Sequence, residues 1–347
     1  MKLEIMKMPY MKKCFLHLFA ALLTLSAAGC ADDGEPRRET EEPVYIVMSP
    51  QEALTRAGAT DDDISTFRVL LFERTNGRGL RYNFYYDDFL NASRTLVLTV
   101  HTGAFDFVFV ANEAGDTRLH NVLENLATGA QLSSLDSEYF SAASFTDTDY
   151  VPMAGVARNV NIIEDYKLQV DGGAAITTSW DIGPYLKRLA VRIDFNVATA
   201  DSWVWNNLTS FQIDNLPSKV YLFEQNVSSQ AIYNNDGTYT AARSFTTADC
   251  DSGTGWSGGT GTWKKARIIV PSNVFTPAAT KANAITVKAN LLGVSPVSVA
   301  LGRALGTNDY TSPRGTYYTF NGTLQQAEIK FTVEVASWGA VQNVDME

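Results

Sequence analysis

Alternation of apolar and polar residues, the period of a β-strand, recurs along the chain from residue 43 onward. It is clearest near the end, where the apolar positions are Ile329, Phe331, Val333 and Val335. Strands are predicted at residues 43–48, 66–73, 79–86, 94–103, 104–113, 185–198 and 328–335. The pattern therefore predicts an all-β protein with minor α content.

One segment has a helical period instead. Within residues 117–140, the apolar positions at helical spacing are Leu119, Val122, Leu123 and Leu126. Gly129 should end this helix, because glycine favours helix C-termini. We expect one short helix in the first half of the chain, and no long helix.

Two of the predicted strands are separated only by the turn residues Thr102 and Gly103. One face of the second strand has Phe105, Phe107 and Phe109, and the other has Asp106, Val108 and Val110. This arrangement predicts an antiparallel meander around one core.

The length of 347 residues favours two domains, and the turn residues Gly183 and Pro184 provide a boundary. We expect two β-sandwich-like domains of antiparallel strands in tandem. The predicted parts are a signal peptide at 1–29, a propeptide at 30–56, an N-terminal domain at 57–183 and a C-terminal domain at 184–347.

The N-terminal region has the features of a secretory signal. Positive charge at residues 11–13 precedes a dozen mostly apolar residues at 14–25, a stretch too short to span a bilayer. Met11 is therefore a second candidate start codon. Small residues up to Gly29 precede Cys30 and resemble a lipobox, which predicts cleavage between the two and lipidation of Cys30. The alternative is an ordinary signal peptide with a chance cysteine.

The chain after Cys30 is strongly acidic. The chain carries −10 and its first 29 residues carry +3, so a product beginning at Cys30 would carry −13, which argues against a nucleic-acid partner. The segment that follows is charged and lacks apolar periodicity, as in a disordered tether. Asp32, Asp33 and Glu35 in it resemble the surface-export signal of lipoproteins in the Bacteroides group. A solvated linker without that signal is the alternative.

Residues for catalysis are scarce. Beyond the signal segment the chain has two histidines, His101 and His120, and neither belongs to a metal-binding or triad motif. Cys250 has no histidine near it in sequence, so a reactive thiol is not expected. We predict a protein that is not an enzyme and has no cofactor.

Three loop motifs also favour structural interpretations. Residues 253–258 match G-x-G-x-x-G, but no helix pattern follows to bind a phosphate. The acidic runs at 61–63 and 147–149 lack EF-hand spacing. We therefore predict no metal site.

Tryptophans provide one candidate binding surface. Trp203 and Trp205 alternate in one predicted strand, and Trp256 and Trp263 flank the glycine-rich loop. Together they could form a platform for sugars, although alternating aromatics on strands more often pack in a core.

Four stretches together resemble a known family. Residues 51–73 resemble the proteolytic maturation site of fimbrillins, the stalk subunits of type V pili in the Bacteroides group. Residues 94–115 are similar to N-domain strands of FimA-type fimbrillins, 185–197 to the strand that opens their C-domain, and 327–347 to their last strands. The resemblance covers nearly the whole chain.

The resemblance implies a lipidated precursor that is exported to the cell surface, with the outer membrane as its first anchor. An Arg-specific protease would cut after Arg56 and leave Ala57 as the new N-terminus. The product would join a fimbrium that supports adhesion to a host or bacterial surface ligand. The segment removed would include the strand Val44, Tyr45, Ile46, Val47 and Met48.

Loss of a strand from a sheet leaves unpaired backbone groups and an open apolar groove. The resemblance implies that a C-terminal strand of an identical or related subunit fills it, here with Trp338, Val341 and Val344 as candidate donor residues. Four or five buried apolar side chains would contribute on the order of 10 kcal/mol before ordering costs. Because donor and groove are different surfaces, the contact propagates into a filament.

Two alternatives remain open from the sequence. An anchor or tip subunit belongs to the same class, and an anchor would stay lipidated and uncleaved at Arg56. A surface lipoprotein that binds glycans through its tryptophans belongs to a different class.

Overall fold

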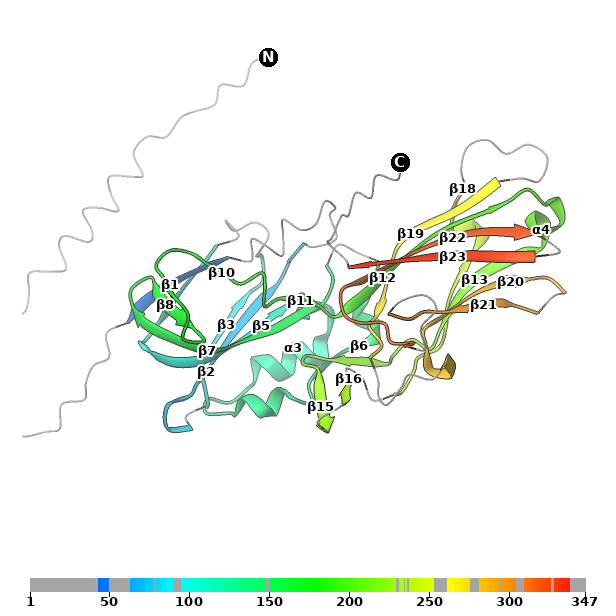
Figure 1. Cartoon of the computed structure of the whole chain (residues 1–347). Helices are drawn as coiled ribbons and strands as arrows, with labels where there is room; N and C mark the ends of the chain where they lie inside the picture. The colour runs from blue at the N-terminus through cyan, green and yellow to red at the C-terminus, as the bar shows by residue number, and fades with distance from the viewer. Residues whose placement is uncertain are drawn as a thin grey trace, which may run out of the picture. The chain divides into compact units, whose positions relative to one another are not determined.

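The computed structural model describes residues 43–49, 63–77, 79–89, 95–147, 150–228, 231–233, 235, 237–252, 261–274, 281–293, 295–303, 309–325 and 328–337. All of them belong to one compact unit, Glu42–Glu347. Most of its elements are strands in antiparallel pairs, which confirms the predicted all-β class with minor α content (Figure 1). Among these residues, no helix has the length and apolar character needed to cross a membrane.

Two sheets enclose the first hydrophobic core. The smaller has the order β10 (Trp180–Asp181), β1 (Val44–Ser49), β4 (Leu96–Val100). The larger has the order β3 (Gly79–Tyr86), β2 (Phe67–Glu73), β5 (Gly103–Ala111), β7 (Met153–Glu164), β8 (Lys167–Val170), β9 (Ala175–Ile176), and β11 (Lys187–Arg188) also pairs with β7. The buried residues between them run from Val44 to Leu186 in sequence.

The predicted meander is wrong at the junction of β4 and β5. The two strands belong to different sheets, and the chain crosses between them at Thr102. Leu98 on β4 and Phe107 on β5 are both fully buried in the first core. The two strands therefore enclose the core from opposite sides, where a meander would have paired them in one sheet.

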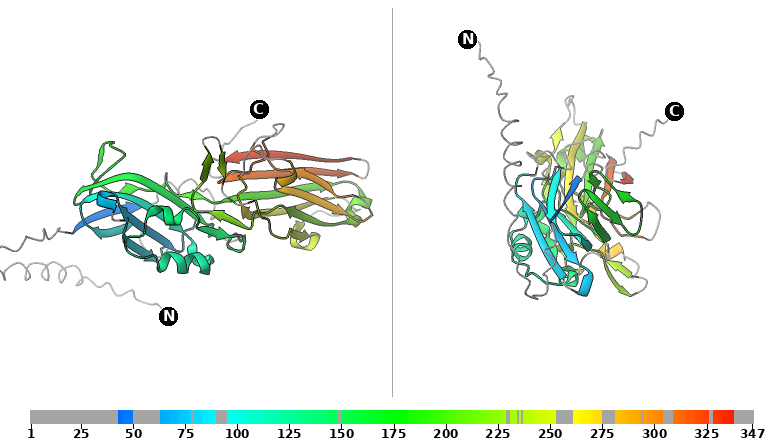
Figure 2. Two further views of the ribbon diagram at one scale, coloured as in Figure 1. Left: turned by 90° about the horizontal axis from the view of Figure 1, so that it is seen from below. Right: turned by 90° about the vertical axis from the view of Figure 1, so that its left-hand side faces the viewer.

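Two further sheets enclose a second core. One has the order β18 (Asp251–Ser252), β19 (Gly261–Pro271), β12 (Ala190–Thr199), β22 (Thr316–Gln325), β23 (Glu328–Ser337). The other has the order β17 (Arg243–Thr246), β13 (Leu208–Asp214), β20 (Thr286–Leu291), β21 (Val297–Ala300). Figure 2 shows β22 and β23, in orange and red, running side by side. The second core runs from Val191 to Val333 in sequence.

A third cluster joins residues of the two halves. It packs Val108 of β5 and Leu119 with Val220 and Ile269. Two short ladders complete the fold, β6 (Tyr139–Ser141) with β14 (Lys219–Tyr221), and β15 (Gln225–Ser228) with β16 (Ala231–Tyr233). The domain boundary near residue 183 stays a proposal, and the change from the first core to the second between Leu186 and Val191 supports it.

The predicted helix is shorter than its apolar pattern. Helix α3 (Thr117–Glu124) begins where expected, but it ends before Gly129. Gly129 lies in a turn with a φ of 85°, and Gly129 and Ala130 hydrogen-bond to the backbone of Leu80 in β3, at 2.8 and 2.7 Å. The 3-10 helices are η2 (Thr75–Gly77), η3 (Glu113–Gly115), η4 (Leu132–Leu135), η5 (Ala142–Ser144), η6 (Thr247–Asp249) and η7 (Lys281–Asn283).

A second helix replaces a predicted strand. Helix α4 (Ser202–Asn207) contains the two alternating tryptophans. The carboxylate of Asp201 accepts from the backbone N–H of Trp203 at 2.9 Å and of Val204 at 3.4 Å, which is an N-cap. The cap satisfies N–H groups that the first helical turn leaves unpaired.

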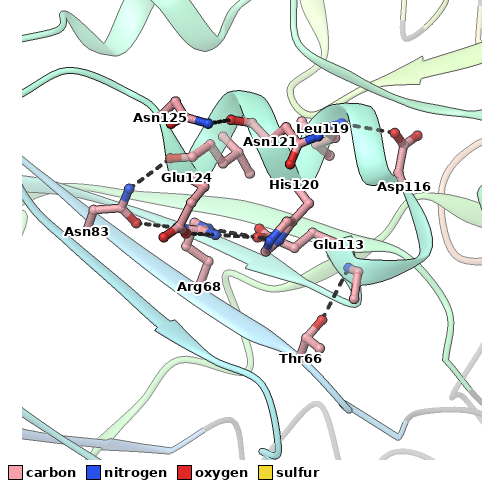
Figure 3. A network of polar contacts seen from close by, with 12 residues as sticks. Thr66, Arg68, Asn83, Glu113, Asp116, Leu119, His120, Asn121, Glu124 and Asn125 are labelled. Carbon is pink, nitrogen blue, oxygen red and sulfur yellow. Dashed lines mark hydrogen bonds and ion pairs between the residues drawn. The ribbon is translucent and has the colours of Figure 1, made fainter.

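A buried ionic network fastens α3 to the larger sheet (Figure 3). The side chain of Arg68 on β2 is 1% exposed and donates to Glu113 at 2.8 Å, Glu124 at 2.8 Å and Asn83 at 2.6 Å. Burial alone would lower the pKa of Arg68, but the bonds and charges of the two glutamates outweigh burial, so the pKa is raised. The Nδ1 of His120 lies 3.0 Å from Glu113, whose side chain is fully buried.

We expect Arg68→Met to lower the free energy of unfolding by about 3–5 kcal/mol, because Glu113 would remain buried without its cation. Denaturant unfolding of the full chain measures this loss. Adding Glu113→Gln should recover part of it, since that change removes the unpaired charge. Arg158→Met is the matched control. That side chain is 58% exposed, so its loss should stay under about 0.5 kcal/mol. Equal losses for the two arginines would contradict the importance of the network.

Asp116 caps the start of α3 and also holds the chain near β6. Its carboxylate accepts from the N–H of Leu119 at 3.0 Å, the N–H of Ser141 at 2.7 Å and the hydroxyl of Ser144 at 3.0 Å. Burial raises the pKa of Asp116, but these hydrogen bonds outweigh burial and the pKa is lowered.

A lowered pKa in the folded state means that ionised Asp116 stabilises the fold above the unfolded pKa of about 3.9, and that this contribution is lost as pH falls through the lower, folded pKa. The stability difference between the natural chain and Asp116→Asn should therefore shrink as pH is lowered from 6 to about 3. Urea unfolding across that range is the measurement. A difference that stays constant with pH would contradict the role of the charge.

Candidate strand-exchange site

Strand β1 lies inside its sheet, although it is the first strand of the described chain (Figure 1). On one side it pairs antiparallel with β4, from Val44 opposite Val100 to Met48 opposite Leu96. On the other side its last residues pair parallel with β10, where Met48 lies opposite Trp180. No described strand other than β1 joins β4 to β10.

The side chains of β1 alternate between core and surface. Val44, Ile46 and Met48 are 9%, 1% and 0% exposed and belong to the first core. Tyr45 points outward and is 39% exposed. At about 2 kcal/mol each, three inward side chains contribute on the order of 6 kcal/mol. This is less than the sequence estimate, because β1 fills three core positions where four or five were expected.

An aromatic group belongs to the same core. The ring of Trp180 lies edge-on to its neighbours, with centroids 5.3 Å from Phe107, 5.8 Å from Phe109 and 5.6 Å from Tyr185. Without β1, one edge of β4 and one edge of β10 would lose their partner, and the buried surface that contacts β1 would be open to water. The site can therefore bind an extended segment with apolar residues at alternate positions.

The ends of β1 have further backbone contacts. At one end, the N–H of Ile182 donates to the carbonyl of Ser49 at 2.9 Å. At the other, the N–H of Tyr45 donates to the carboxylate of Asp165 at 3.0 Å, and the N–H of Tyr166 donates to the carbonyl of Tyr45 at 2.8 Å. The strand is thus held along both edges.

The last strand stays in its own sheet. All ten residues of β23 pair with β22, and β23 forms the edge of that sheet. Of the two possibilities for the C-terminal region, retention of Ile329 to Val335 in the subunit's own sheet is the one observed.

Several predicted residues lie outside the described part of the chain. They are Gly29, Cys30, Arg56, Ala57, Trp338, Val341 and Val344. Their roles in signal cleavage, lipidation, maturation and strand donation stay predictions.

Of the four tryptophans in the predicted platform, the two whose side chains the structure describes are used for packing. Trp263 is 2% exposed and packs in the second core, with its ring centroid 6.5 Å from Phe211. Trp203 lies on α4 and is partly buried against the same core, while Trp256 lies outside the described residues. The side chain of Trp205 is likewise not described. The described rings of Trp203 and Trp263 thus favour the core-packing interpretation over a sugar platform.

The histidines and the cysteine occupy separate structural positions. His101 contacts the hydroxyl of Tyr82, whereas His120 belongs to the Arg68 network. Cys250 is a buried free thiol whose Sγ lies 3.6 Å from the carbonyl of Thr246. No group of three or more candidate metal ligands occurs among the residues that the structure describes.

Asp147, from the acidic run 147–149, has a structural role as well. Its carboxylate accepts from Arg243 at 2.7 Å and from the backbone N–H of Ile269 at 2.8 Å. Asp147 thereby links the chain after η5 to β17 and β19. Sequence reasoning could not foresee this contact, because its partners lie far along the chain.

Comparison with known proteins places this fold beside those of fimbrial and adhesion proteins. Residues 44–183 match the family model of the major fimbrial subunit protein (FimA). Over these residues the sequence is similar to that family. A search of curated proteins finds no significant match.

Solved structures of fimbrial and adhesion proteins share the fold. The tip fimbrial protein Mfa3 from Porphyromonas gingivalis, with a C-terminal truncation, is 13% identical with a TM-score of 0.59, covering 85% of this chain and 100% of its own. A candidate cell adhesion protein from Parabacteroides distasonis is 14% identical with a TM-score of 0.50, covering 87% of this chain and 98% of its own.

The inward positions of β1 should carry its contribution to stability. We expect Ile46→Ala to lower the free energy of unfolding of the full chain by about 2–4 kcal/mol, because the residue is 1% exposed. Val47→Ala, at a half-buried outward position, should cost about 1 kcal/mol or less. Denaturant unfolding of both variants tests the orientation of β1. If the two losses were equal, the proposed core face would be wrong.

Proposed function

We propose that the chain is a stalk subunit of a surface fimbria that polymerises by strand exchange. It is made as a precursor with β1 in place and is activated by cleavage after Arg56, which removes β1 and leaves Ala57 first. The interior position of β1 is the observation that supports this proposal. Removal of an edge strand would only shorten a sheet, whereas removal of β1 opens a gap between β4 and β10.

The order of the chain supports the same proposal. Arg56 follows β1 and precedes β2 (Phe67–Glu73), so one cut separates β1 from everything that it packs against. Arg37 and Arg38 precede β1, and a cut there would leave it attached. Among these arginines, only Arg56 provides a cut that empties the groove.

Export as a lipoprotein explains the residues before β1. Cleavage at Gly29 and lipidation of Cys30 would anchor the precursor in the outer membrane, and the charged tether would separate it from the bilayer. Cleavage after Arg56 then frees the subunit from its lipid. The chain acts by assembly and not as an enzyme, and its partners are other fimbrial subunits and the Arg-specific protease.

The donor is proposed to be the C-terminal segment that follows β23. Successive residues of a strand face opposite sides, so Val341 and Val344 cannot both enter the groove from a regular strand. Trp338, Ala340, Gln342 and Val344 share one face of such a strand. Trp338 and Val344 are the large apolar residues on that face, and Gln342 lies between Ala340 and Val344.

An anchor or a tip subunit is the alternative within the class. The shared fold with a tip protein at 13% identity does not separate these roles. Arg56 separates the anchor from the stalk, because an anchor keeps its lipid and needs no cut after β1.

N-terminal sequencing of protein sheared from cells tests the proposal. We expect chains that begin at Ala57, and we expect Arg56→Ala to abolish stable polymer ladders while the precursor stays folded. Arg38→Ala is the control and should leave polymers unchanged, since it lies before β1. Recovery only of chains that begin at Cys30, or normal ladders from Arg56→Ala, would overturn the stalk assignment.

A further inference from the structure

The turn between β7 and β8 contacts β1 at a single residue. Asp165 and Tyr166 form this turn, and together they bond both backbone polar groups of Tyr45. The carboxylate of Asp165 accepts from the Tyr45 N–H at 3.0 Å, and the N–H of Tyr166 donates to the Tyr45 carbonyl at 2.8 Å. The turn therefore presents one acceptor and one donor, as the edge of a neighbouring strand would.

The position of these bonds follows from strand geometry. In an antiparallel pair, alternate residues direct their N–H and C=O toward the partner and away from it. Tyr45 lies opposite Thr99 of β4, and its backbone groups point to the other edge of β1. On that edge, β10 pairs only with Met48 and Ser49. β10 thus pairs with the end of β1, and the turn forms hydrogen bonds with the beginning of β1 along the same edge.

The side chains of the turn add a second contact. The rings of Tyr45 and Tyr166 stack with centroids 6.3 Å apart and an interplanar angle of 23°. They are 39% and 48% exposed, so the pair lies on the surface and outside the core. Tyr166 has a φ of 59°, in the left-handed region that a bulky residue rarely adopts. In this conformation its ring and its N–H both reach Tyr45.

We propose that the Asp165–Tyr166 turn is a selectivity element of the strand-exchange site, an inference that rests on the proposed function. The turn contacts the residue of the bound strand that lies opposite Thr99 of β4. It requires a backbone N–H there, which excludes proline, and it favours a strand with an aromatic ring at that position. The partner it selects is an extended segment of a fimbrial subunit, and β1 is the segment that now satisfies it.

Hydrogen exchange in the full, uncleaved chain tests the contact itself. Asp165→Ala should speed exchange of the Tyr45 amide about fivefold or more, because its acceptor is lost. Asp165→Asn keeps a side-chain oxygen and should stay within about twofold of the natural chain. Rates that do not differ between these two variants would overturn the proposal.

Asp171→Ala provides a matched control on the same hairpin. The carboxylate of Asp171 accepts from the side chain of Asn159 at 2.6 Å, within the hairpin itself, so the Tyr45 amide should keep its natural exchange rate. Faster exchange in this control, equal to that of Asp165→Ala, would mean that the whole hairpin is destabilised and would count against a specific contact.

Selectivity is measured with peptides of residues 43–50 added to the chain after it is cut at Arg56 in vitro and freed of its first segment. Tyr45→Phe in the peptide should bind within about twofold of the natural peptide, Tyr45→Ala about fivefold more weakly, and Tyr45→Pro without detectable affinity. Equal binding of all four peptides would refute the selectivity. Failure of the natural peptide itself would refute strand exchange, while the exchange rates in the uncut chain would still decide the contact at Tyr45.

Discussion

Pairing of β1 with β4 on one edge and β10 on the other is the contact on which the first half of the molecule depends. Val44, Ile46 and Met48 pack in the first core, against residues of the larger sheet. β1 is hydrogen-bonded on both edges and packed on one face, yet only its C-terminal end connects it to the strands that it contacts. High stability in place and removal by a single cut are therefore compatible properties of the same segment.

Contacts elsewhere in the fold hold the larger sheet, which packs against β1, in place. Arg68 and the two glutamates fasten α3 to the face of the larger sheet that points away from β1. The third cluster ties that face to residues of the second half. Arg68 and Glu113 are fully buried while Glu124 is 54% exposed, so the network runs from the surface of α3 to the sheet and holds the two together.

Periodicity predicts strands well where one face packs on a core, as Val333 of β23 and the three phenylalanines of β5 show. It did not predict partners, because alternation defines the faces of a strand and not its neighbours; hence β4 and β5 were placed in one sheet. Alternating aromatics around Trp203 predict a strand, but Asp201 before them caps the helix that forms there. Arg68 could not be recognised as buried, since its partners come from residues 45 and 56 positions away.

The candidate site was predictable in part for the same reason. The apolar run from Val44 to Met48 marks a strand, but its interior position depends on pairs with residues far along the chain. The role of the turn at Asp165 and Tyr166 could not be predicted from the sequence, because it depends on a contact with Tyr45, which is 120 positions away.

The position of β1 also bears on the order in which the chain folds. Its pairing with β4 needs residues up to Val100, and its pairing with β10 needs residues up to Asp181. A chain exported from its N-terminus would deliver β1 first and complete its sheet only after more than half of the sequence had crossed. Until then β1 and β4 have an unpaired edge and are able to pair wrongly, so the earliest strand has to wait for a partner that is delivered much later.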